Sequence, residues 1–472
     1  MKKFNVNFVC KVLFAGFILL GFFLLLCARS NFVLSDTAWH LKVGDYILRT
    51  RNIPKQDTFS LLGSTETMKF IPHEWLSEVI YSLVYKLFSL NGLYILAGVF
   101  VYVSFMFFIV KSKNIFTGTL LTCIFIAVNF ITLIQIRPDI FGIFLLVLSG
   151  YNFAFNSDKK CIEFNVLLSV LIANLHGGSV SVNLIQQLWI VICLFCLSNK
   201  KVPKDKVIVI LTTLFSSLLN PSGINIFKYI FIINTSNAEY SGDWVKLQFD
   251  NVFQVLIVLS IFALALYNWG RKQDKSTSDK LSILIMFMYL VMVFTFDRTK
   301  TMFVFAFILY MSKYIDLKRI WGRCFKIIAT CVSAYLIIFF ILNKKLPNCT
   351  MQEYIYNNII TSDIINEVSD KRYFNELDLG GYLIYLDKKP FIDTRGELYL
   401  SAYGNTELFT PYIKSLYSET LMKGLTDKYN LDYLLLRRNS LTSQIFYTSD
   451  DWEVFKECKE VVLFKKNNMK KG

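Results

Sequence analysis

Long apolar runs alternate with short polar segments from residue 1 to about residue 345. Apolar runs of about 18 or more residues with few charges are candidates for membrane-spanning helices. We predict about eleven such helices, near residues 1–27, 79–110, 115–134, 140–155, 162–175, 182–197, 207–219, 252–269, 281–296, 302–314 and 327–342. The pattern therefore predicts an all-α polytopic membrane domain over residues 1–345, in which residues 29–77 form a loop on the outer membrane surface.

The pattern changes character after about residue 346. Apolar runs shorten to the length of strands at GYLIYL, PFID, DYLLLR, EVFKE and VVLFKK, and the stretch TPYIKSLYSETLMKGLTDKY between them has helical spacing. Strands that alternate with helices indicate a small α/β domain. We therefore predict a second domain over residues 346–472, which we expect to fold as a soluble unit when it is separated from the spans.

Two features of this second domain leave alternatives open. Asp393, Arg395 and Glu397 cluster in the sequence FIDTRGE beside a predicted strand. They could contact an acceptor or pair with one another, and we favour pairing. Cys349 and Cys458 lie outside the predicted spans and could form a disulfide, but their spacing does not decide this.

The charge distribution gives the predicted spans an orientation. If the N-terminus lies in the cytoplasm, the lysine clusters around Lys111, Lys204, Lys272 and Lys318 all fall on the cytoplasmic side, as the positive-inside rule expects. The second domain and the three histidines then lie outside the cytoplasm. A net charge of +15 with 54% hydrophobic residues fits a multi-pass protein of the cell membrane. Because the basic residues lie in short loops between spans, we do not expect nucleic acid as a partner.

The outer loop concentrates ionisable residues. Residues 35–78 contain Asp36, His40, His73 and Glu74, and both ends of this stretch carry apolar residues at helical spacing. Asp36 follows the first predicted span by only a few residues, so we place it at the membrane interface, where an ionisable side chain is a functional candidate. The alternative is that Asp36 is only the N-cap of the helix that follows.

Cations in two tight turns of the outer face suit a phosphate group. Arg137 lies in the sequence QIRPD, and Arg298 and Lys300 follow the ninth predicted span. A planar guanidinium binds phosphate oxygens in pairs. A phosphate at membrane depth belongs to a lipid, and a nearby carboxylate such as Asp36 could deprotonate an acceptor hydroxyl. The alternatives are that these cations reach lipid headgroups or form local ion pairs.

The same face offers groups that ligate metals. Mixed imidazole and carboxylate sets suit several divalent metals, and Asp36, His40, His73, Glu74 and His176 provide such groups. Their spacing is not that of a compact ligand motif. A divalent metal is therefore an open alternative, and we expect no other cofactor. His176 precedes two glycines, so it could instead bond the carbonyls at a helix end.

Several segments together resemble a bacterial group of GT-C-type membrane glycosyltransferases. The run DTAWHLKVGDYILRTRNIPKQDTFS, followed by HEWLSEVIY, is similar to the first extracytoplasmic loop of that group. Further matches are QIRPD, NLHGG, LLNPSG, and GGYLIYL with PFIDTRGELY. The resemblance implies a GT-C-like fold, a polyprenyl-phosphate sugar donor and an inverting transfer. Many members of the wider superfamily carry paired acids in this loop, whereas here Asp36 follows Ser35.

Taken with the resemblance, the residue chemistry predicts a membrane glycosyltransferase that moves a sugar from a polyprenyl-phosphate donor to an extracytoplasmic glycan, lipid or protein. The residues of the expected site are the general base Asp36, the phosphate ligands Arg137, Arg298 and Lys300, and the pocket residues His40, His73, Glu74 and His176. Two alternatives remain. A transporter of lipid-linked glycans would need polar residues through the bilayer depth, and a non-catalytic membrane scaffold would make the outer-face acids dispensable.

Overall fold

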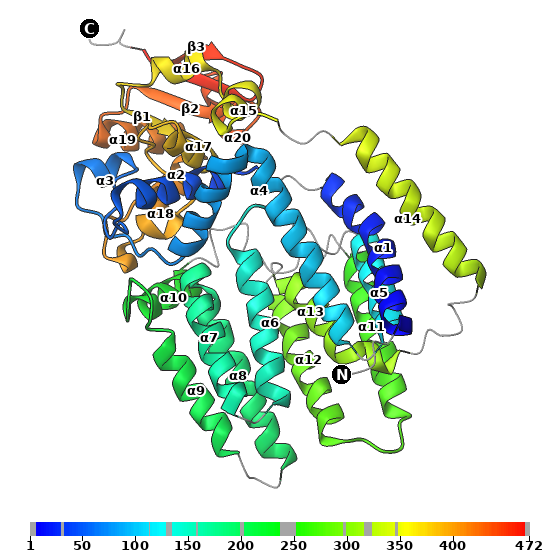
Figure 1. Ribbon diagram of the computed structural model, residues 1–472. Helices are drawn as coiled ribbons and strands as arrows, with labels where there is room; N and C mark the ends of the chain where they lie inside the picture. Colours follow the sequence, from blue (N-terminus) through cyan, green and yellow to red (C-terminus); the bar gives the residue numbers. More distant parts are fainter. Residues whose placement is uncertain are drawn as a thin grey trace. The chain divides into compact units, whose positions relative to one another are not determined.

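The computed structural model describes residues 6–29, 33–112, 114–128, 135–156, 159–198, 203–236, 252–295, 299–315, 323–344 and 348–467. Most of these residues are helical, and their strands form a four-stranded sheet near the C-terminus (Figure 1). Within the described ranges, five helical segments are long and apolar enough to cross a membrane, namely Phe8–Leu25, Trp75–Lys111, Ser179–Leu197, Thr277–Phe294 and Lys326–Asn343. The shorter apolar helices include Ile115–Ala127, Asp139–Phe155 and Gln254–Gly270.

The chain forms two compact units that do not follow the order of the sequence. The first, here called the helical unit, comprises Met1–Phe32, Tyr94–Ile230 and Ala238–Leu346, and the second, the loop–tail unit, comprises Val33–Leu93, Phe231–Asn237 and Pro347–Gly472. The predicted domains also divide the chain near residue 346, but they leave the outer loop with the spans. In the structure that loop and the C-terminal tail belong to one unit, because each covers apolar side chains of the other.

Helices are found where the apolar runs predict them. The helices that correspond to predicted spans are α1 (Val6–Arg29), α4 (Trp75–Lys111), α5 (Ile115–Ala127), α6 (Asp139–Phe155), α7 (Lys159–Leu175), α8 (Ser179–Leu197), α9 (Lys204–Ser216), α11 (Val252–Gly270), α12 (Thr277–Thr295), α13 (Lys300–Met311) and α14 (Arg323–Asn343). A further helix, α10 (Asn225–Ser236), follows the turn at Pro221 and was not predicted. The number of helices that cross the membrane stays a prediction.

Close packing in the helical unit depends on small residues. Helix α1 packs against α14 and α5. A Cβ atom added to Gly21 of α1 would lie 2.6 Å from the Cα of Ser333 in α14, and the Ser333 hydroxyl donates to the Ile18 carbonyl at 3.1 Å. Small residues at such a crossing let two helix backbones approach in an apolar environment.

Helix α4 is interrupted at Ser89, where φ is 53° and ψ is −155°. This position lies two residues before the Asn91-Gly92 pair. A helix of 37 residues is about 55 Å long, which exceeds the roughly 30 Å thickness of a bilayer core. The residues before Ser89 belong to the loop–tail unit, so α4 supplies both units.

The outer loop folds around an amphipathic helix, α2 (Ser35–Thr50). Its apolar positions Trp39, Val43 and Ile47 are buried together with Phe59 and with Ile384 from the tail. The helical spacing predicted at this end of the loop is therefore confirmed. A short helix, α3 (Leu61–Thr65), follows α2. A Cβ atom at Gly44 of α2 would lie 2.0 Å from the carbonyl oxygen of Glu78 in α4, so only glycine permits this approach.

The tail is an α/β structure built on a mixed sheet. Its strands are β1 (Tyr373–Asn375), β2 (Tyr433–Arg437), β3 (Trp452–Glu457) and β4 (Val461–Lys466), in the order β1-β2-β4-β3. β1 pairs with β2 in parallel, whereas β2–β4 and β3–β4 are antiparallel, with a register shift between Val454 and Lys456. The helices of the tail are α15 (Met351–Asn358), α16 (Ser362–Glu367), α17 (Gly380–Tyr385), α18 (Phe409–Ser415), α19 (Glu419–Tyr429) and α20 (Leu441–Phe446).

Three of the five predicted strands are confirmed as β2, β3 and β4, and the predicted helical stretch forms α18 and α19. Two strand predictions are wrong. The GYLIYL run is helix α17, and PFID lies between elements without strand pairing. Residues 380–384 are all buried, and a short apolar run that is buried all round has no periodicity to separate strand from helix.

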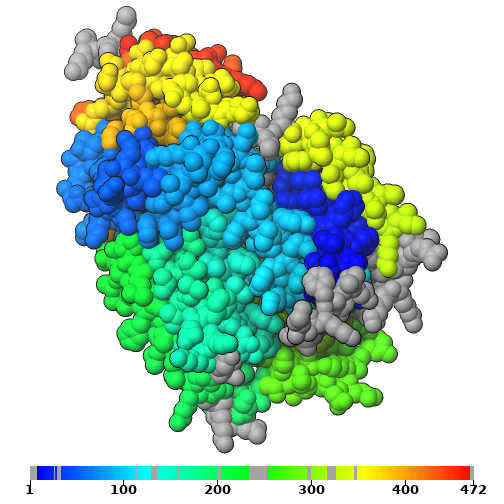
Figure 2. Space-filling model, in the orientation of Figure 1, coloured from blue at the N-terminus to red at the C-terminus, as the bar shows by residue number. Residues whose placement is uncertain are grey.

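Backbone and side-chain hydrogen bonds join the loop to the tail within the loop–tail unit. The Leu61 amide donates to the Pro390 carbonyl at 2.8 Å, and the Ile71 amide donates to the Tyr403 hydroxyl at 2.8 Å. Figure 2 shows the blue atoms of the loop directly against the yellow and orange atoms of the tail. Cys349 and Cys458 are both free thiols.

Candidate functional site

Asp36 lies in the first turn of α2, and the N-cap of this helix is Leu34. The Leu34 amide donates to the Thr37 hydroxyl oxygen at 3.3 Å, so the cap uses Thr37 rather than Asp36. The alternative that Asp36 is the N-cap is therefore wrong. A carboxylate in the first turn is stabilised by the positive end of the helix dipole. Asp36 and His40 are four residues apart, which places them on the same face of α2.

A row of ionisable side chains begins at His40. His40 Nε2 lies 3.7 Å from Glu74 Oε2, and His40 Nδ1 lies 3.4 Å from Glu78 Oε1. His73 Nε2 lies 3.7 Å from the same Glu74 oxygen. All four side chains are at most 10% exposed. Removal of several ionisable groups from water costs free energy, and such groups cluster at functional sites.

The surroundings of His40 and His73 differ. The ring of His40 lies against that of Trp39, with centroids 3.7 Å apart and the ring planes tilted by 34°. His73 Nδ1 lies 3.0 Å from the Ile71 carbonyl oxygen; because a carbonyl only accepts, this nitrogen donates. Burial lowers the pKa of His73 to about 4, although the bond to Ile71 acts in the opposite direction. His73 is therefore neutral near pH 7, with its proton on Nδ1.

Glu78 extends the row into the first turns of α4. It is 1% exposed, and its Oε2 atom has no hydrogen-bond partner within the described part of the chain. A buried carboxylate oxygen without a donor is costly when it is ionised. Such a group is a natural place for a proton to be held.

A second buried cluster joins the loop to the tail. Arg395 donates through Nε and Nη2 to Asp393 at 2.8 Å each, and through Nη1 to Asp57 Oδ1 at 2.9 Å. Tyr399 donates to Asp393, and Ser60 donates to Asp57, both at 2.5 Å. The predicted pairing of Asp393 with Arg395 is confirmed. We call Asp57, Asp393 and Arg395 the loop–tail latch.

Pairing within the latch keeps Asp57 and Arg395 ionised. Burial alone would raise the pKa of Asp57, but the Arg395 guanidinium and hydrogen bonds from Ser60 and Phe59 hold it below its usual value. The pKa of Arg395 is raised by Asp393 and Asp57 against the effect of burial, so it stays protonated.

Glu397 lies two residues beyond Arg395 and is 8% exposed. Burial raises the pKa of the Glu397 carboxyl to about 7, and the charges of Asp393 and Asp36 act in the same direction.

Arg137, His176 and Lys300 belong to the helical unit. Arg137 is half-buried just before α6, and Lys300 is the first residue of α13 and 3% exposed. His176 Nδ1 lies 2.6 Å from the Ser179 hydroxyl oxygen, which links the end of α7 to the start of α8. A Cβ at Gly142 of α6 would lie 2.9 Å from the same nitrogen. Arg298 lies outside the described residues.

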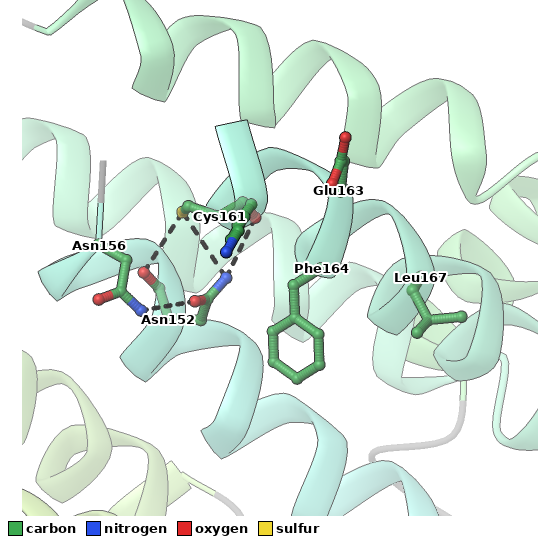
Figure 3. A pocket seen from close by; sticks show the side chains of 7 residues that line it. Asn152, Asn156, Cys161, Glu163, Phe164 and Leu167 are labelled. Atoms are coloured by element: carbon green, nitrogen blue, oxygen red, sulfur yellow. Dashed lines mark hydrogen bonds between the residues drawn. The ribbon is translucent and has the colours of Figure 1, made fainter. Parts of the chain in front are cut away.

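A cavity of about 540 Å³ lies in the helical unit, between the end of α6 and the start of α7. Figure 3 shows Asn152, Asn156 and Cys161 in its wall, joined by hydrogen bonds. The Asn152 amide group donates to the Cys161 carbonyl at 3.1 Å, and that of Asn156 donates to Asn152 at 2.7 Å. The Asn152 amide connects α6 to α7, and none of the predicted site residues that the structure describes lines the cavity.

The geometry bears on the metal alternative. In the described ranges, no group of three or more His, Cys, Asp or Glu side chains is arranged to hold a metal ion. The nearest arrangement is Glu74 between His40 and His73, with Glu74 Oε2 3.7 Å from the Nε2 atom of each ring. Metal dependence therefore stays a prediction that only experiment tests.

The site contains residues that the sequence pattern did not single out. Glu78 was visible at the end of the loop, and its position four residues after Glu74 indicates a shared helix face. Asp57 had no local signal, because its partner Arg395 lies 338 positions away. For Glu397, the sequence pattern indicated a cluster with Asp393 and Arg395 but no connection with Asp36.

Comparisons with known proteins identify the fold. No model of a known protein family matches the sequence, and no curated protein sequence matches it. The crystal structure of the oligosaccharyltransferase of Archaeoglobus fulgidus, which carries a tethered acceptor peptide with an NVT sequon, matches 92% of this chain and 69% of that chain. The TM-score is 0.54 and the identity is 10%. At this identity the likeness concerns the fold. The chain therefore has a fold similar to that of an archaeal oligosaccharyltransferase.

Proposed function

We propose that this protein is an inverting membrane glycosyltransferase. It takes a sugar from a polyprenyl-phosphate donor and transfers it to a glycan, lipid or protein acceptor on the extracytoplasmic side of the cell membrane. The likeness to an oligosaccharyltransferase supports a membrane glycosyltransferase in general. The donor, the acceptor class and the inverting stereochemistry are our proposal, drawn from the chemistry of the predicted site.

The observation that carries the proposal is the arrangement around the start of α2. Asp36 occupies the first turn, His40 follows on the same helix face, and Glu74 and Glu78 both lie beside the His40 ring. A carboxylate next to buried groups that hold or release protons is suited to general base catalysis. In a membrane protein with a GT-C-like fold, the natural proton donor is an acceptor hydroxyl or amide.

Each group has one role in the proposed reaction. The Asp36 carboxylate removes the acceptor proton while the acceptor oxygen or nitrogen attacks the anomeric carbon of the sugar. The bond from that carbon to the phosphate oxygen breaks, and the polyprenyl phosphate leaves with the electron pair. Attack opposite the leaving group inverts the anomeric centre. His40, His73, Glu74 and His176 line the pocket in this proposal.

The leaving phosphate requires cations. We assign this role to Arg137, Arg298 and Lys300, because guanidinium groups pair with phosphate oxygens. Lys300 is 3% exposed at the first residue of α13. In this proposal Arg137 and Arg298 bind the donor phosphate, so loss of either should weaken use of the donor mainly through the KM for the donor. A divalent metal could share this role, which a chelator tests.

The transporter alternative predicts a polar path through the helical unit. Helix α8 does bury polar residues, including Asn183 and Gln186. The Gln186 side chain, however, donates to the Leu146 carbonyl at 2.9 Å and accepts from the Tyr289 hydroxyl at 2.8 Å. These bonds tie α6, α8 and α12 together, as interhelical hydrogen bonds do in membranes. We therefore rank a transporter below a transferase.

The test is transfer from a synthetic polyprenyl-phosphate sugar by the purified full-length protein, with and without a chelator. Asp36→Asn keeps the shape of the side chain but loses its basicity. We expect transfer to fall by roughly two to four orders of magnitude while protein level and membrane insertion stay normal. Asp45→Asn is the matched control, because Asp45 lies on the same helix and binds the exposed Arg49 at 2.7 Å.

The outcomes separate the alternatives. Loss of transfer in Asp36→Asn but not in Asp45→Asn supports Asp36 as the base. Full activity in Asp36→Asn rejects this role. If the wild-type protein binds the lipid-linked sugar and moves it across vesicle membranes without transfer, the protein is a transporter. If it neither binds nor transfers the donor, the scaffold alternative holds.

A further inference from the structure

The tail places one fully buried cation inside the core of the loop. Arg395 is 2% exposed, and its guanidinium is held by Asp393 from the tail and Asp57 from the loop. A planar guanidinium with fixed donor directions fits two carboxylates at once, which an ammonium group cannot reproduce. The position of this side chain is therefore tightly defined.

Aromatic rings of the loop surround the same guanidinium. The ring centroids of Trp39, Phe59 and Phe70 lie 5.7, 5.6 and 5.5 Å from Arg395 Cζ. All three rings belong to buried side chains of the loop. Cation–π attraction is stronger where the cation is removed from water. Arg395 thus fixes the orientation of Trp39 from one side.

Trp39 connects Arg395 to the candidate site. Its other neighbour is His40, whose ring centroid is 3.7 Å away. Asp36 lies three residues before Trp39 on the same helix, where side chains are neighbours. The tail also binds the first residue of this helix, because the Gly381 amide donates to the Ser35 hydroxyl at 2.9 Å. The start of α2 is thus held by the tail at two points, Ser35 and Trp39.

We propose that Arg395 is a positioning residue for the candidate site: through Trp39 it holds His40 and Asp36 in their working orientation. Its consequence for sugar transfer rests on the proposed function, whereas its consequence for the geometry of His40 does not. The tail is then part of the site, although the side chain of Arg395 is occupied by Asp57 and Asp393.

The chain offers a direct readout, because it has only three histidines. Full-length protein labelled with ¹⁵N-histidine in detergent micelles gives signals for His40, His73 and His176, assigned by single substitutions. Arg395→Lys keeps the charge but loses the planar fork. We expect it to shift the two ring-nitrogen signals of His40 and leave those of His176 unchanged, since His176 lies in the helical unit. Asp393→Asn loosens the same guanidinium from the tail side and should shift the His40 signals in the same direction.

A matched control separates positioning from loss of stability. Leu435→Ala removes a buried side chain of β2 that packs in a different core cluster, with Leu463 and Tyr433. It should lower the melting temperature without shifting the His40 signals. Unchanged His40 signals in both Arg395→Lys and Asp393→Asn overturn the proposal, and so does an equal shift in Leu435→Ala.

Sugar transfer by the Arg395→Lys variant is measured in a separate experiment. In Arg395→Lys we expect kcat per folded molecule to fall by about 100-fold with the KM for the donor little changed, because a misplaced base slows the chemical step. A purely structural role would lower only the folded fraction. If the wild-type protein transfers no sugar but the His40 signals respond as expected, the positioning role stands and the proposed function fails. If transfer is normal in Arg395→Lys, the positioning role fails and the proposed function stands.

Discussion

Arg395 Nη1 lies 2.9 Å from Asp57 Oδ1, although 338 positions separate the two residues in the sequence. This contact joins the C-terminal tail to the loop after the first helix. It is buried on both sides, with side chains that are 1% and 0% exposed. The same pair therefore contributes to the stability of the loop–tail unit and to the geometry of the candidate site.

Asp57→Asn should destabilise the loop–tail unit. Both oxygens of Asp57 accept hydrogen bonds, Oδ1 from Phe59 and Arg395 and Oδ2 from Ser60, so an amide group would face a donor on either side. Breaking one side of a buried ion pair costs roughly 3–5 kcal/mol. Unfolding of the purified protein by denaturant, followed by tryptophan fluorescence, measures the change.

The control for this variant is Asp378→Asn. Asp378 pairs with Arg437 at 2.8 Å, but the two side chains are 53% and 24% exposed. An exposed pair contributes about 0–1 kcal/mol. An equal loss of stability in both variants would contradict a special role for the buried latch.

Gly381→Ala should separate the tail from α2. An added Cβ would lie 2.1 Å from the Ser35 carbonyl oxygen, so the backbones must move apart. Overpacking of this kind costs about 1–3 kcal/mol. Gly424→Ala in α19 is the control, because nothing lies within 4 Å of its Cβ position and alanine favours helix by up to about 1 kcal/mol. The melting temperatures should move in opposite directions, and a common shift would argue against the close approach.

Glu397 should make stability depend on pH. Its pKa is raised from 4.5 to about 7 in the folded protein, mainly by burial. Between these values the folded state binds more protons than the unfolded state, so the free energy of unfolding falls as pH rises. The contribution is complete below pH 4.5 and is lost as pH rises through about 7. Glu397→Gln should remove this part of the slope when unfolding is measured from pH 5 to pH 8. An unchanged slope would show that the pKa of the Glu397 carboxyl is not raised in the folded protein.

The isolated tail tests how the chain is divided. Its sequence pattern predicts a domain that folds alone. In the structure, however, the loop supplies Asp57, which is one of the two carboxylates that bind Arg395, and the three aromatic rings around the guanidinium. We therefore expect residues 348–467 alone to be poorly ordered by amide NMR. Joining residues 33–88 through a flexible linker should restore dispersed signals. Well-dispersed spectra of the tail alone would favour the boundary that the sequence indicates.

The helices could be predicted because their cause is local. Runs of apolar residues end at charged clusters, and a helix satisfies every backbone hydrogen bond inside a bilayer. The amphipathic helix at Trp39 and Val43 followed from spacing in the same way. Strands β2, β3 and β4 were also visible, but GYLIYL was not separable from a strand, since burial on all sides leaves no period to detect.

Asp36, His40, His73 and Glu74 were recognisable because acids and two histidines gathered in one loop are conspicuous in any sequence. The residues that contact them could not be recognised in this way. The sequence could not show that Glu78 completes the row at His40, that the tail closes over the loop, or that Arg395 meets Asp57. Those contacts join segments far apart in the chain, and a side chain carries no local mark of a partner that only folding brings to it. The types of residue in the site were thus determined by the sequence, and their charge and orientation by the tertiary structure, because burial and pairing decide both.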